Sequence, residues 1–376
     1  MLKSIKIIDD NGRIYDSLRK LSEHLNVSRD FITKRLKDNG CLEFNGHTYS
    51  IYTDNSRYQN RGVENAIDFN NADIEIDEYK EFQQYKSVKE QGVEVYKFNY
   101  TERESGYKYA VALFSDAHIE ETVNPENILN LNEYNIDIAK QRIEAYFQNL
   151  AICLNRDGVD ELIFASLGDT ISGYIHEELS QQNSMTPVEA TFIAQSILFS
   201  GLKFLCENTN VKNIKFVGIV GNHSRTTKKI QHSNGYKMSY EYLMYKNIEK
   251  QCKECDLPIE IYIPESEFAI ISTPDDKKFI FCHGFQIRGG TNTVCGIYPA
   301  LQRLSLKWNK IIKQDKIYMG HFHQCISIPN AVVNGSIIGY NSFALSNGMS
   351  YEEPAQMYEV YDTSIGHICT RKIYCK

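Results

Sequence analysis

Five short segments of this chain carry residue types that bind divalent metal ions. They read Asp-Ala-His, Gly-Asp, Gly-Asn-His, His-Gly and Gly-His-Phe-His in chain order. Carboxylate, amide and imidazole ligands without cysteine suit Mn²⁺ best, with Fe or Zn²⁺ as alternatives. The residues concerned are Asp116, His118, Asp169, Asn222, His223, His283, His321 and His323.

Each segment directly follows a run of apolar residues that predicts a buried strand. The runs cover residues 111–114, 162–167, 216–220, 279–282 and 317–319. In α/β sheets the carboxyl ends of the strands face the ligand site. A lone Asp-x-His or a single strand histidine is usually structural. Five such strand ends together instead predict one shared metal-binding pocket.

The order of these segments, from Asp-x-His to Gly-His-x-His, resembles the calcineurin-like metallophosphoesterase superfamily. The resemblance covers about residues 109–323, and the strand-like tail at 325–374 is consistent with that family's second sheet. It implies an α/β fold in which two mixed sheets form a sandwich flanked by helices.

The resemblance also implies a role for each matched position. Asp169 would bridge two metal ions, and His223 would be the catalytic histidine rather than a ligand. The other ligands would form two sets: Asp116, His118 and His323 for one ion, and Asn222, His283 and His321 for the second.

General chemistry supports the same roles. Two cations about 3.5–4 Å apart need a shared anion, which a carboxylate at Asp169 supplies. The ions lower the pKa of a bound water, and the resulting hydroxide attacks phosphorus in line with the leaving oxygen. Both ions offset charge on the phosphoryl oxygens, and His223 stabilises that charge or protonates the leaving group. The sequence therefore predicts a metal-dependent phosphoesterase.

Three features near the site modify this prediction. The family usually has an acidic residue after Gly-Asn-His, whereas Ser224 stands there and leaves the partner of His223 unidentified. The insert at residues 119–133 predicts a rim loop that shapes access to the pocket. Arg225 and His176 are predicted to contact substrate. The alternative for both is an ordinary polar residue in a loop.

Residues 1–52 predict a separate small domain. Turn sequences at 9–12 and 45–46 predict two hairpins. Residues 17–25 and 28–37 have helical spacing, and Ser28 can cap the second helix. This order resembles a winged helix-turn-helix module. Its second helix carries basic residues that would contact DNA or form a solvated basic face: Arg29, Lys34 and Arg35.

The rest of the chain divides into a linker and a catalytic domain. Residues 53–92 are polar and predict a linker with a short helix near 78–89. Strands alternate with helices across 93–376, which predicts the metallophosphoesterase domain. The helices are expected at 137–155, 187–207, 239–252 and 298–310.

Composition limits the partners and the compartment. The net charge of −7 argues against a protein that merely coats DNA, although bound metal ions can supply local positive charge to a nuclease. Ten cysteines with one C-x-x-C pair, Cys252 and Cys255, predict reduced thiols. The N-terminal apolar run is too short for a signal peptide, and no run approaches about 18 apolar residues. A cytoplasmic protein without a membrane partner is expected.

Three functions remain open. A phosphodiesterase or nuclease acting on DNA is favoured by the N-terminal domain. It is also favoured by segments 132–135 and 174–178, which resemble a bacteriophage-encoded group related to the DNA-repair nucleases. A phosphodiesterase or phosphatase acting on nucleotides or phosphoproteins fits the acidic charge better. A non-enzymatic DNA-binding scaffold is the third, and the complete ligand set argues against it.

Overall fold

The computed structural model describes residues 6–51, 105–287 and 296–376. The chain divides into two compact units, residues 1–100 and 101–376. The expected linker at 53–92 and its helix lie outside the described residues. The three domain boundaries drawn from the sequence therefore stay a prediction.

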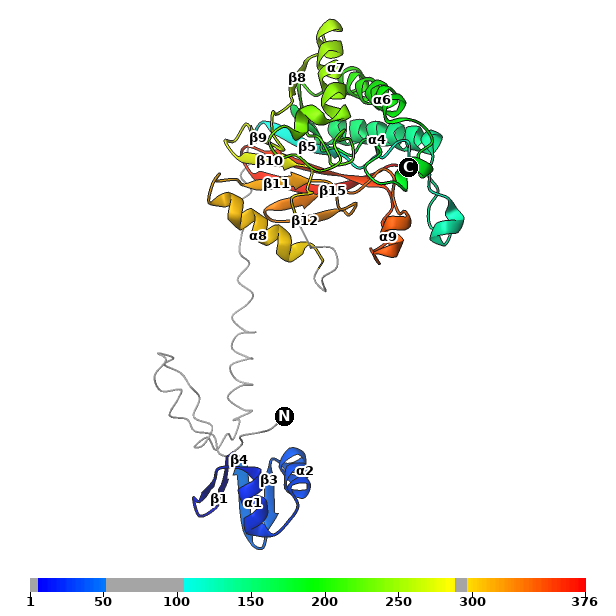
Figure 1. Cartoon of the computed structure of the whole chain (residues 1–376). Helices are drawn as coiled ribbons and strands as arrows, with labels where there is room; N and C mark the ends of the chain where they lie inside the picture. Colours follow the sequence, from blue (N-terminus) through cyan, green and yellow to red (C-terminus); the bar gives the residue numbers. More distant parts are fainter. Residues whose placement is uncertain (1–5, 52–104, 288–295) are drawn as a thin grey trace. The chain divides into compact units, whose positions relative to one another are not determined.

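The first unit is a small sheet with two helices (Figure 1). Its strands are ordered β2-β1-β4-β3. Ser17 and Ser28 cap the helices, each accepting a hydrogen bond from a backbone N–H of the first turn. These elements agree with the predicted ones, but they do not identify a winged helix-turn-helix module, which stays a prediction. Their bounds are β1 Ile7–Asp9, β2 Ile14–Tyr15, α1 Leu18–Leu25, α2 Arg29–Asn39, β3 Cys41–Phe44 and β4 His47–Ile51.

The second unit contains a six-stranded sheet ordered β15-β14-β5-β6-β7-β8. Strands β5 to β8 are parallel, whereas β14 and β15 add antiparallel strands beyond β5. The bounds are β5 Lys108–Phe114, β6 Glu161–Ser166, β7 Asn213–Gly218, β8 Ile259–Tyr262, β14 Ala355–Asp362 and β15 Gly366–Tyr374.

A second sheet of five strands is ordered β12-β13-β11-β10-β9. Its central strands β10, β11 and β13 are parallel, and β9 and β12 run antiparallel at the edges. Both sheets are thus mixed, as expected. The bounds are β9 Phe268–Ser272, β10 Lys278–Cys282, β11 Lys316–Met319, β12 Ile326–Ile328 and β13 Ala331–Val333.

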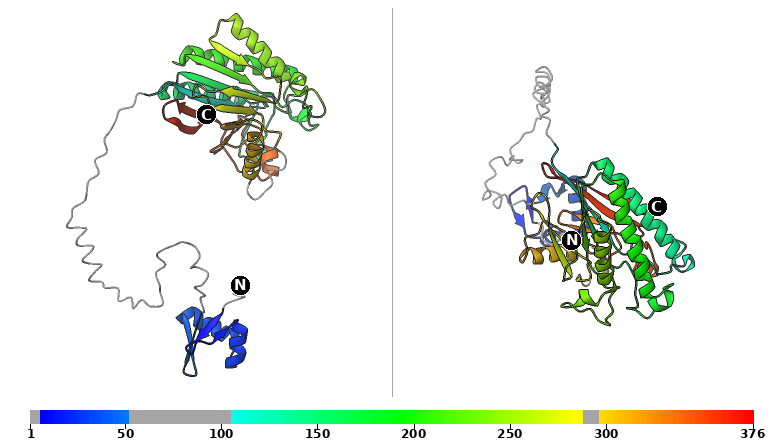
Figure 2. Two further views of the ribbon diagram at one scale, coloured as in Figure 1. Left: turned by 90° about the vertical axis from the view of Figure 1, so that its left-hand side faces the viewer. Right: turned by 90° about the horizontal axis from the view of Figure 1, so that it is seen from above.

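Helices cover the outer faces of the two sheets (Figures 1 and 2). One layer lies against the six-stranded sheet and another lies beside the five-stranded sheet. Thr186 and Glu189 form a reciprocal capping box at the start of α6. The main helices are α4 Ile136–Asp157, α6 Pro187–Asn208, α7 Tyr240–Glu254, α8 Tyr298–Asn309 and the short α9 Ser342–Ser346.

Strand β5 shows why the layers form. Its alternate residues Tyr109, Val111 and Leu113 belong to the core between the sheets, while Ala110, Ala112 and Phe114 belong to the core beneath α4, α6 and α7. A strand buried on both faces reads as a continuous apolar run. The predicted α/β sandwich of two mixed sheets flanked by helices is therefore confirmed.

Helix α6 bears on the expectation that no segment of the chain could span a membrane. Among the described residues it is the one helix long and apolar enough to cross a membrane by length and composition. Its inner stripe packs in the core with α4 and α7, and includes Ala190, Leu198 and Leu205. Packing in the core explains the apolar residues on the inner side of α6. On its outer side, Phe192 is exposed.

Candidate metal centre

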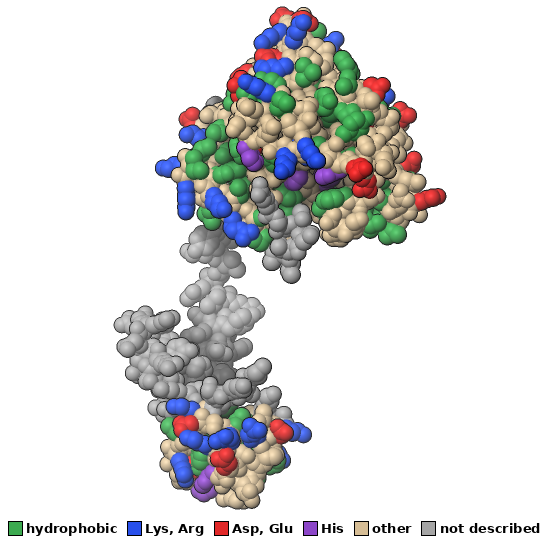
Figure 3. Space-filling view, viewed as in Figure 1, with side chains coloured by type: hydrophobic (Ala, Val, Ile, Leu, Met, Phe, Trp, Pro, Cys, Tyr) green, Lys and Arg blue, Asp and Glu red, His purple; other side chains and the backbone are tan. Residues whose placement is uncertain are grey.

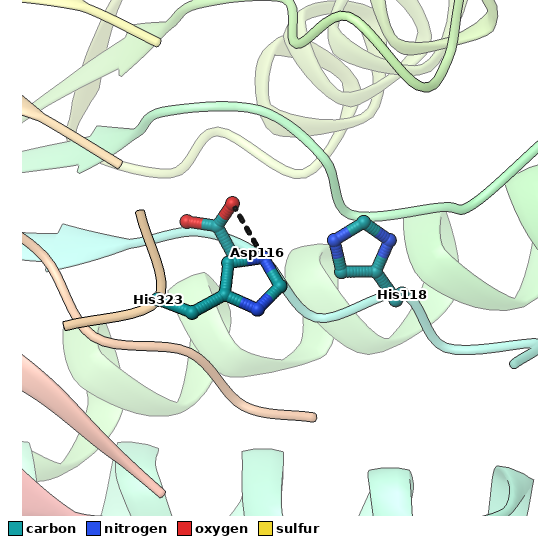
Figure 4. Close-up of side chains that lie close together, drawn as sticks. All are labelled: Asp116, His118 and His323. Atoms are coloured by element: carbon teal, nitrogen blue, oxygen red, sulfur yellow. Dashed lines mark ion pairs between the residues drawn. The ribbon is translucent and has the colours of Figure 1, made fainter. Parts of the chain in front are cut away.

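Two clusters of metal-ligating side chains lie where the strands end. In the first, ligand atoms of Asp116, His118 and His323 lie within 4.8 Å of one another. Asp116 and His118 follow β5, and His323 follows β11 (Figure 4). The Asp116 carboxylate lies 3.4 Å from Nε2 of His323. The structure thus brings together the first predicted ligand set.

The second cluster consists of Asp169, His283 and His321, again within 4.8 Å. These residues follow β6, β10 and β11. Asn222, predicted for the same ion, follows β7 and lines the same pocket. Its Oδ1 is buried and has no hydrogen-bond partner among the described residues. All seven predicted ligands therefore converge at one place.

The two clusters are joined through the turn after β11. His321 belongs to one cluster and His323 to the other, and buried Phe322 lies between them in the chain. The backbone N–H of His321 donates to both carboxylate oxygens of Asp116, at 3.1 and 3.0 Å. The two clusters therefore share one turn and one hydrogen-bonded carboxylate.

Most of these ligands have an unusual backbone conformation. Eleven described residues other than glycine have positive φ, and five of them are predicted ligands. Left-handed backbone costs a residue with a side chain roughly 1–3 kcal/mol, and such positions concentrate at functional sites. These turns aim the side chains into the pocket at the expense of stability. The five ligands are Asp116, His118, Asp169, His321 and His323.

Glycines beside the ligands permit the close approach of the turns. A Cβ at Gly221 would collide with the carboxylate of Asp169, and one at Gly320 would lie 2.6 Å from Oδ2 of Asp116. Both glycines therefore leave room for a ligand carboxylate. This explains on steric grounds why the sequence has Gly before Asn222 and before His321.

The unpaired atoms of the site test whether these residues fit metal ions. Nε2 of His118, like Oδ1 of Asn222, is buried without a hydrogen-bond partner among the described residues. Nε2 of His283 lies 2.8 Å from Oδ2 of Asp169 but without hydrogen-bond geometry. Buried polar atoms are normally satisfied, so unsatisfied ones need an explanation. Divalent cations accept such lone pairs, and the residues fit them.

The charges of the site are strongly coupled. Burial alone would raise the pKa of Asp169, but His283 and His223 hold it well below its usual range. Burial lowers the pKa of His283, yet the carboxylates of Asp169 and Asp116 outweigh burial and raise it to about 9. Burial and the charge of His283 lower the pKa of His321 to about 3. A buried, charged carboxylate surrounded by imidazoles is well suited to cations.

His223 is oriented by the backbone. Its Nδ1 lies 3.1 Å from the carbonyl oxygen of Ser172, and its ring makes an edge contact with His118 at 4.8 Å between centroids. Its backbone N–H donates to Oδ1 of Asp169 at 2.8 Å. The partner that the sequence left unidentified is therefore a carbonyl in the turn after β6.

An acidic residue does support the Gly-Asn-His turn, from a distant part of the chain. The hydroxyl of Ser224 donates to Oε2 of Glu241 at 2.8 Å, and Gly221 N–H donates to the same oxygen at 2.7 Å. Oε1 of Glu241 accepts from Thr170 N–H at 2.6 Å. Burial raises the pKa of Glu241 to about 7. Sequence reasoning missed this residue, which begins α7 and looks like an ordinary first-turn acid.

A pocket of about 510 Å³ opens over the two clusters. His176 and His223 both line it, with ring centroids 6.0 Å apart. Figure 3 shows histidines on one face of the second unit. Part of the opposite wall comes from α9 and the residues near it, including Asn341, Phe343 and Met349. The prediction that His176 contacts substrate is consistent with this position and stays a prediction.

The other predicted residues lie elsewhere. Arg225 is not among the described pocket-lining residues, and its guanidinium donates to the carbonyls of Asn222 and Thr227 at 2.5 and 3.1 Å. Its position therefore indicates that it braces the loop. The 119–133 insert packs through Ile119, Val123 and Ile128, and its Glu121 lines the pocket. Its predicted role in shaping access stays a prediction. In the first unit, exposed side chains on α2 include Arg29, Lys34 and Arg35.

The cysteines that the structure describes are free thiols, as expected. Cys252 is buried at the end of α7 and Cys255 is exposed just after it. Both lie apart from the metal-ligand clusters.

Comparisons with known proteins give distant similarities. No protein-family profile matches the chain. The chain is 24% identical over 235 residues to the SPbeta prophage-derived uncharacterized protein YonJ of Bacillus subtilis (strain 168). The alignment covers 61% of this chain and 52% of that protein, so the chain spans about half the length of this relative.

Solved structures with a similar arrangement include enzymes. A 5'-nucleotidase from Candida albicans has a TM-score of 0.34 at 8% identity, covering 73% of this chain and 53% of that one. The sulfate thiohydrolase SoxB from Thermus thermophilus has a TM-score of 0.28 at 9% identity, covering 73% and 57%. At such scores and identities, the chemistry of this chain has to be argued from its own side chains.

Proposed function

We propose that this protein is a two-metal phosphoesterase. The observation that carries the proposal is the pair of buried clusters, Asp116–His118–His323 and Asp169–His283–His321, joined through one turn and lined with unpaired ligand atoms. Asn222 would complete the second set, and Asp169 would serve both ions. Mn²⁺ is the ion proposed, because the ligands combine carboxylate, amide and imidazole without cysteine.

When bound, the two cations would activate a water molecule and offset the negative charge of the phosphoryl oxygens. The chain supplies the remaining parts. Asp169 would supply the carboxylate shared by the two ions, and its low pKa keeps it charged. Nδ1 of His223 is engaged by Ser172, so this ring exchanges protons with a substrate only through Nε2. That nitrogen is proposed to protonate the leaving oxygen or to stabilise the phosphoryl charge.

The pocket favours an ester the size of a nucleotide. Its volume of about 510 Å³ lies within the range of about 300–1,000 Å³ for small-molecule sites. Apolar Leu179, Phe343 and Met349 line it beside the metal ligands, and Phe343 is 63% exposed. A planar leaving group would cover that ring. We therefore place a nucleotide phosphodiester or monoester first among the substrates.

DNA is the second candidate, and exposed basic residues on α2 favour it. Arg29, Lys34 and Arg35 present cations that phosphate groups of nucleic acid would neutralise. Under this reading the first unit binds DNA and the second cleaves it. A phage origin, suggested by the prophage-derived relative, would fit either substrate.

The first experiment measures hydrolysis of bis-p-nitrophenyl phosphate with Mn²⁺. Asp169→Asn should lower kcat/KM by about a thousandfold or more, because removal of a bridging carboxylate loses several kcal/mol of transition-state stabilisation. Asp256→Asn is the matched control, since Asp256 also has a left-handed backbone but is exposed. Absence of turnover with every divalent metal would instead support a non-enzymatic scaffold.

The second experiment separates the substrates. Single- and double-stranded DNA, RNA, cyclic nucleotides, nucleoside monophosphates and a phosphopeptide are each incubated with enzyme and Mn²⁺. Deletion of residues 1–52 should weaken DNA binding and lower its salt dependence, while hydrolysis of small esters is retained. Equal DNA affinity of the full and shortened chains would remove the DNA-targeting role.

A further inference from the structure

We propose that Ser172 is a positioning residue that sets the tautomers of two histidines at once. Its hydroxyl lies 3.0 Å from Nδ1 of His118, and its carbonyl lies 3.1 Å from Nδ1 of His223. One histidine is a proposed metal ligand and the other the proposed catalytic group. The inference therefore rests on the proposed function and names how one turn prepares both parts of the site.

Proton counting fixes the arrangement at His118. The Ser172 hydroxyl has one proton, which it donates to Oε2 of Glu121 at 3.2 Å. The oxygen is then left to accept, so Nδ1 of His118 must carry the proton of their 3.0 Å contact. Nε2 of His118 consequently has a free lone pair. This is the buried nitrogen that lacks a hydrogen-bond partner among the described residues.

The same reasoning assigns the tautomer of His223 more directly. A backbone carbonyl only accepts hydrogen bonds, so Nδ1 of His223 must be the donor to Ser172. Nε2 is then the ring nitrogen left for chemistry. The acidic residue that usually orients this histidine in the resembling family is thus replaced by a carbonyl.

Hydrogen bonds and close packing fix the backbone of the turn that carries Ser172. Oε1 of buried Glu120 accepts the N–H groups of Ser172 and Gly173, both at 2.8 Å. Asn183 Nδ2 donates to the carbonyl of Gly173 at 2.8 Å. Gly173 has φ +59°, and a Cβ there would lie 2.5 Å from the carbonyl oxygen of His223. The turn therefore packs directly on the loop that carries His223, so its carbonyl has little freedom to move.

Binding of Mn²⁺, measured by titration calorimetry, tests the hydroxyl. Ser172→Ala should weaken binding about 10–100-fold, the effect typical of lost partners of metal ligands. Its ester hydrolysis should be most impaired at low Mn²⁺ and recover at least tenfold when Mn²⁺ is raised. Ser172→Thr, which keeps a hydroxyl, should restore much of the affinity.

Ser184→Ala is the matched control. Ser184 also donates a hydroxyl proton within this region, to the carbonyl of Glu120 at 3.1 Å, but none of its hydrogen bonds reaches a histidine. It should bind Mn²⁺ as the wild type does. Equal weakening in both variants would mean that general loosening of the region explains the effect, and would overturn the proposal. So would unchanged affinity in Ser172→Ala.

The tautomers themselves can be observed in the metal-free wild type. Nitrogen chemical shifts of ¹⁵N-histidine-labelled protein should show protonated Nδ1 and unprotonated Nε2 in both His118 and His223. Finding the Nε2–H tautomer in either ring would contradict the inference. Neither this spectrum nor the calorimetry requires turnover, so failure of the positioning role is distinguishable from failure of the phosphoesterase proposal.

Discussion

The two ends of strand β11 show opposite ways of burying polar groups. At its start, Lys316 Nζ lies 2.7 Å from Oε1 of buried Glu359. Oε2 of the same carboxylate accepts from Tyr318 and Tyr361 at 2.8 and 2.7 Å, and Thr370 donates to Oε1 at 2.5 Å. Both carboxylate oxygens are satisfied, so this end of the strand holds the sheets together.

Just beyond the other end, His321 and His323 have left-handed backbone and face buried groups that lack partners. Burial and the charge of His283 lower the pKa of His321 to about 3, and the carboxylates of Asp169 and Asp116 do not offset them. Polar groups of this kind lower stability unless something binds them. The contrast teaches that a fully paired network stabilises the fold, whereas clusters that keep unpaired polar atoms are suited to binding a ligand.

The largest predicted effect on stability comes from the paired end. Glu359→Gln leaves Lys316 as a buried charge without its counter-ion, so unfolding free energy should fall by about 3 kcal/mol or more. Urea denaturation measures it. Glu254→Gln, which breaks an exposed pair with Lys250, is the control and should change it by under about 1 kcal/mol. A similarly small loss of unfolding free energy in both variants would contradict the stabilising role of the Glu359 network.

Asp169→Asn separates the metal site from the paired network. Without metal it too should lose stability, because His283 and His223 hold the pKa of the Asp169 carboxylate below its usual range and the charged form therefore stabilises the fold. With Mn²⁺ at about one hundred times the dissociation constant, the wild type should gain about 2.7 kcal/mol, and the variant should gain little. Thermal melts with and without Mn²⁺ measure this. An equal Mn²⁺-induced shift in the variant would show that Asp169 is not a ligand.

Gly320→Ala should produce a smaller, local effect. The new Cβ would lie 2.6 Å from Oδ2 of Asp116 and must displace that carboxylate, so Mn²⁺ affinity should fall about tenfold, or about 1.4 kcal/mol. Gly235→Ala is the control, because a Cβ there meets open space. Calorimetric titration compares the two. Wild-type affinity in Gly320→Ala would argue that Asp116 does not need its observed position.

The smallest effect concerns pH. Burial raises the pKa of Glu359, but Lys316 outweighs burial and holds it below its usual value. A lowered folded pKa stabilises the protein above the unfolded pKa of about 4.3, and that contribution is lost as pH falls through the folded pKa. The wild type should therefore lose more stability than Glu359→Gln on acidification below about pH 4. Parallel stability curves would contradict this assignment.

The sequence allowed the convergence of the candidate ligands to be predicted because each combines a metal-binding side chain with a strand end. Asp116 and Asp169 follow apolar strands of the six-stranded sheet, and His283 follows one of the five-stranded sheet. The layers could be predicted likewise, since β5 is apolar on both faces. The DNA-binding role of the first unit is not tested by the structure and stays a prediction.

The supporting residues could not be predicted, because their contacts join distant parts of the chain. Glu241 reaches Thr170 and Gly221 across 71 and 20 positions, and Ser172 reaches His118 across 54. Locally, these residues resemble a helix-start acid and a loop serine. Arg225, a basic residue that follows Asn222 closely, is expected to contact substrate phosphate. Its guanidinium donates to loop carbonyls, and the substrate contact stays a prediction.

The most direct test is a crystal of the protein soaked in Mn²⁺ and measured with anomalous X-ray diffraction. Two peaks are predicted, one bounded by Asp116, His118 and His323 and one by Asn222, His283 and His321, with Asp169 in contact with both. Density without such peaks, or manganese bound only elsewhere on the surface, would contradict the two-metal site.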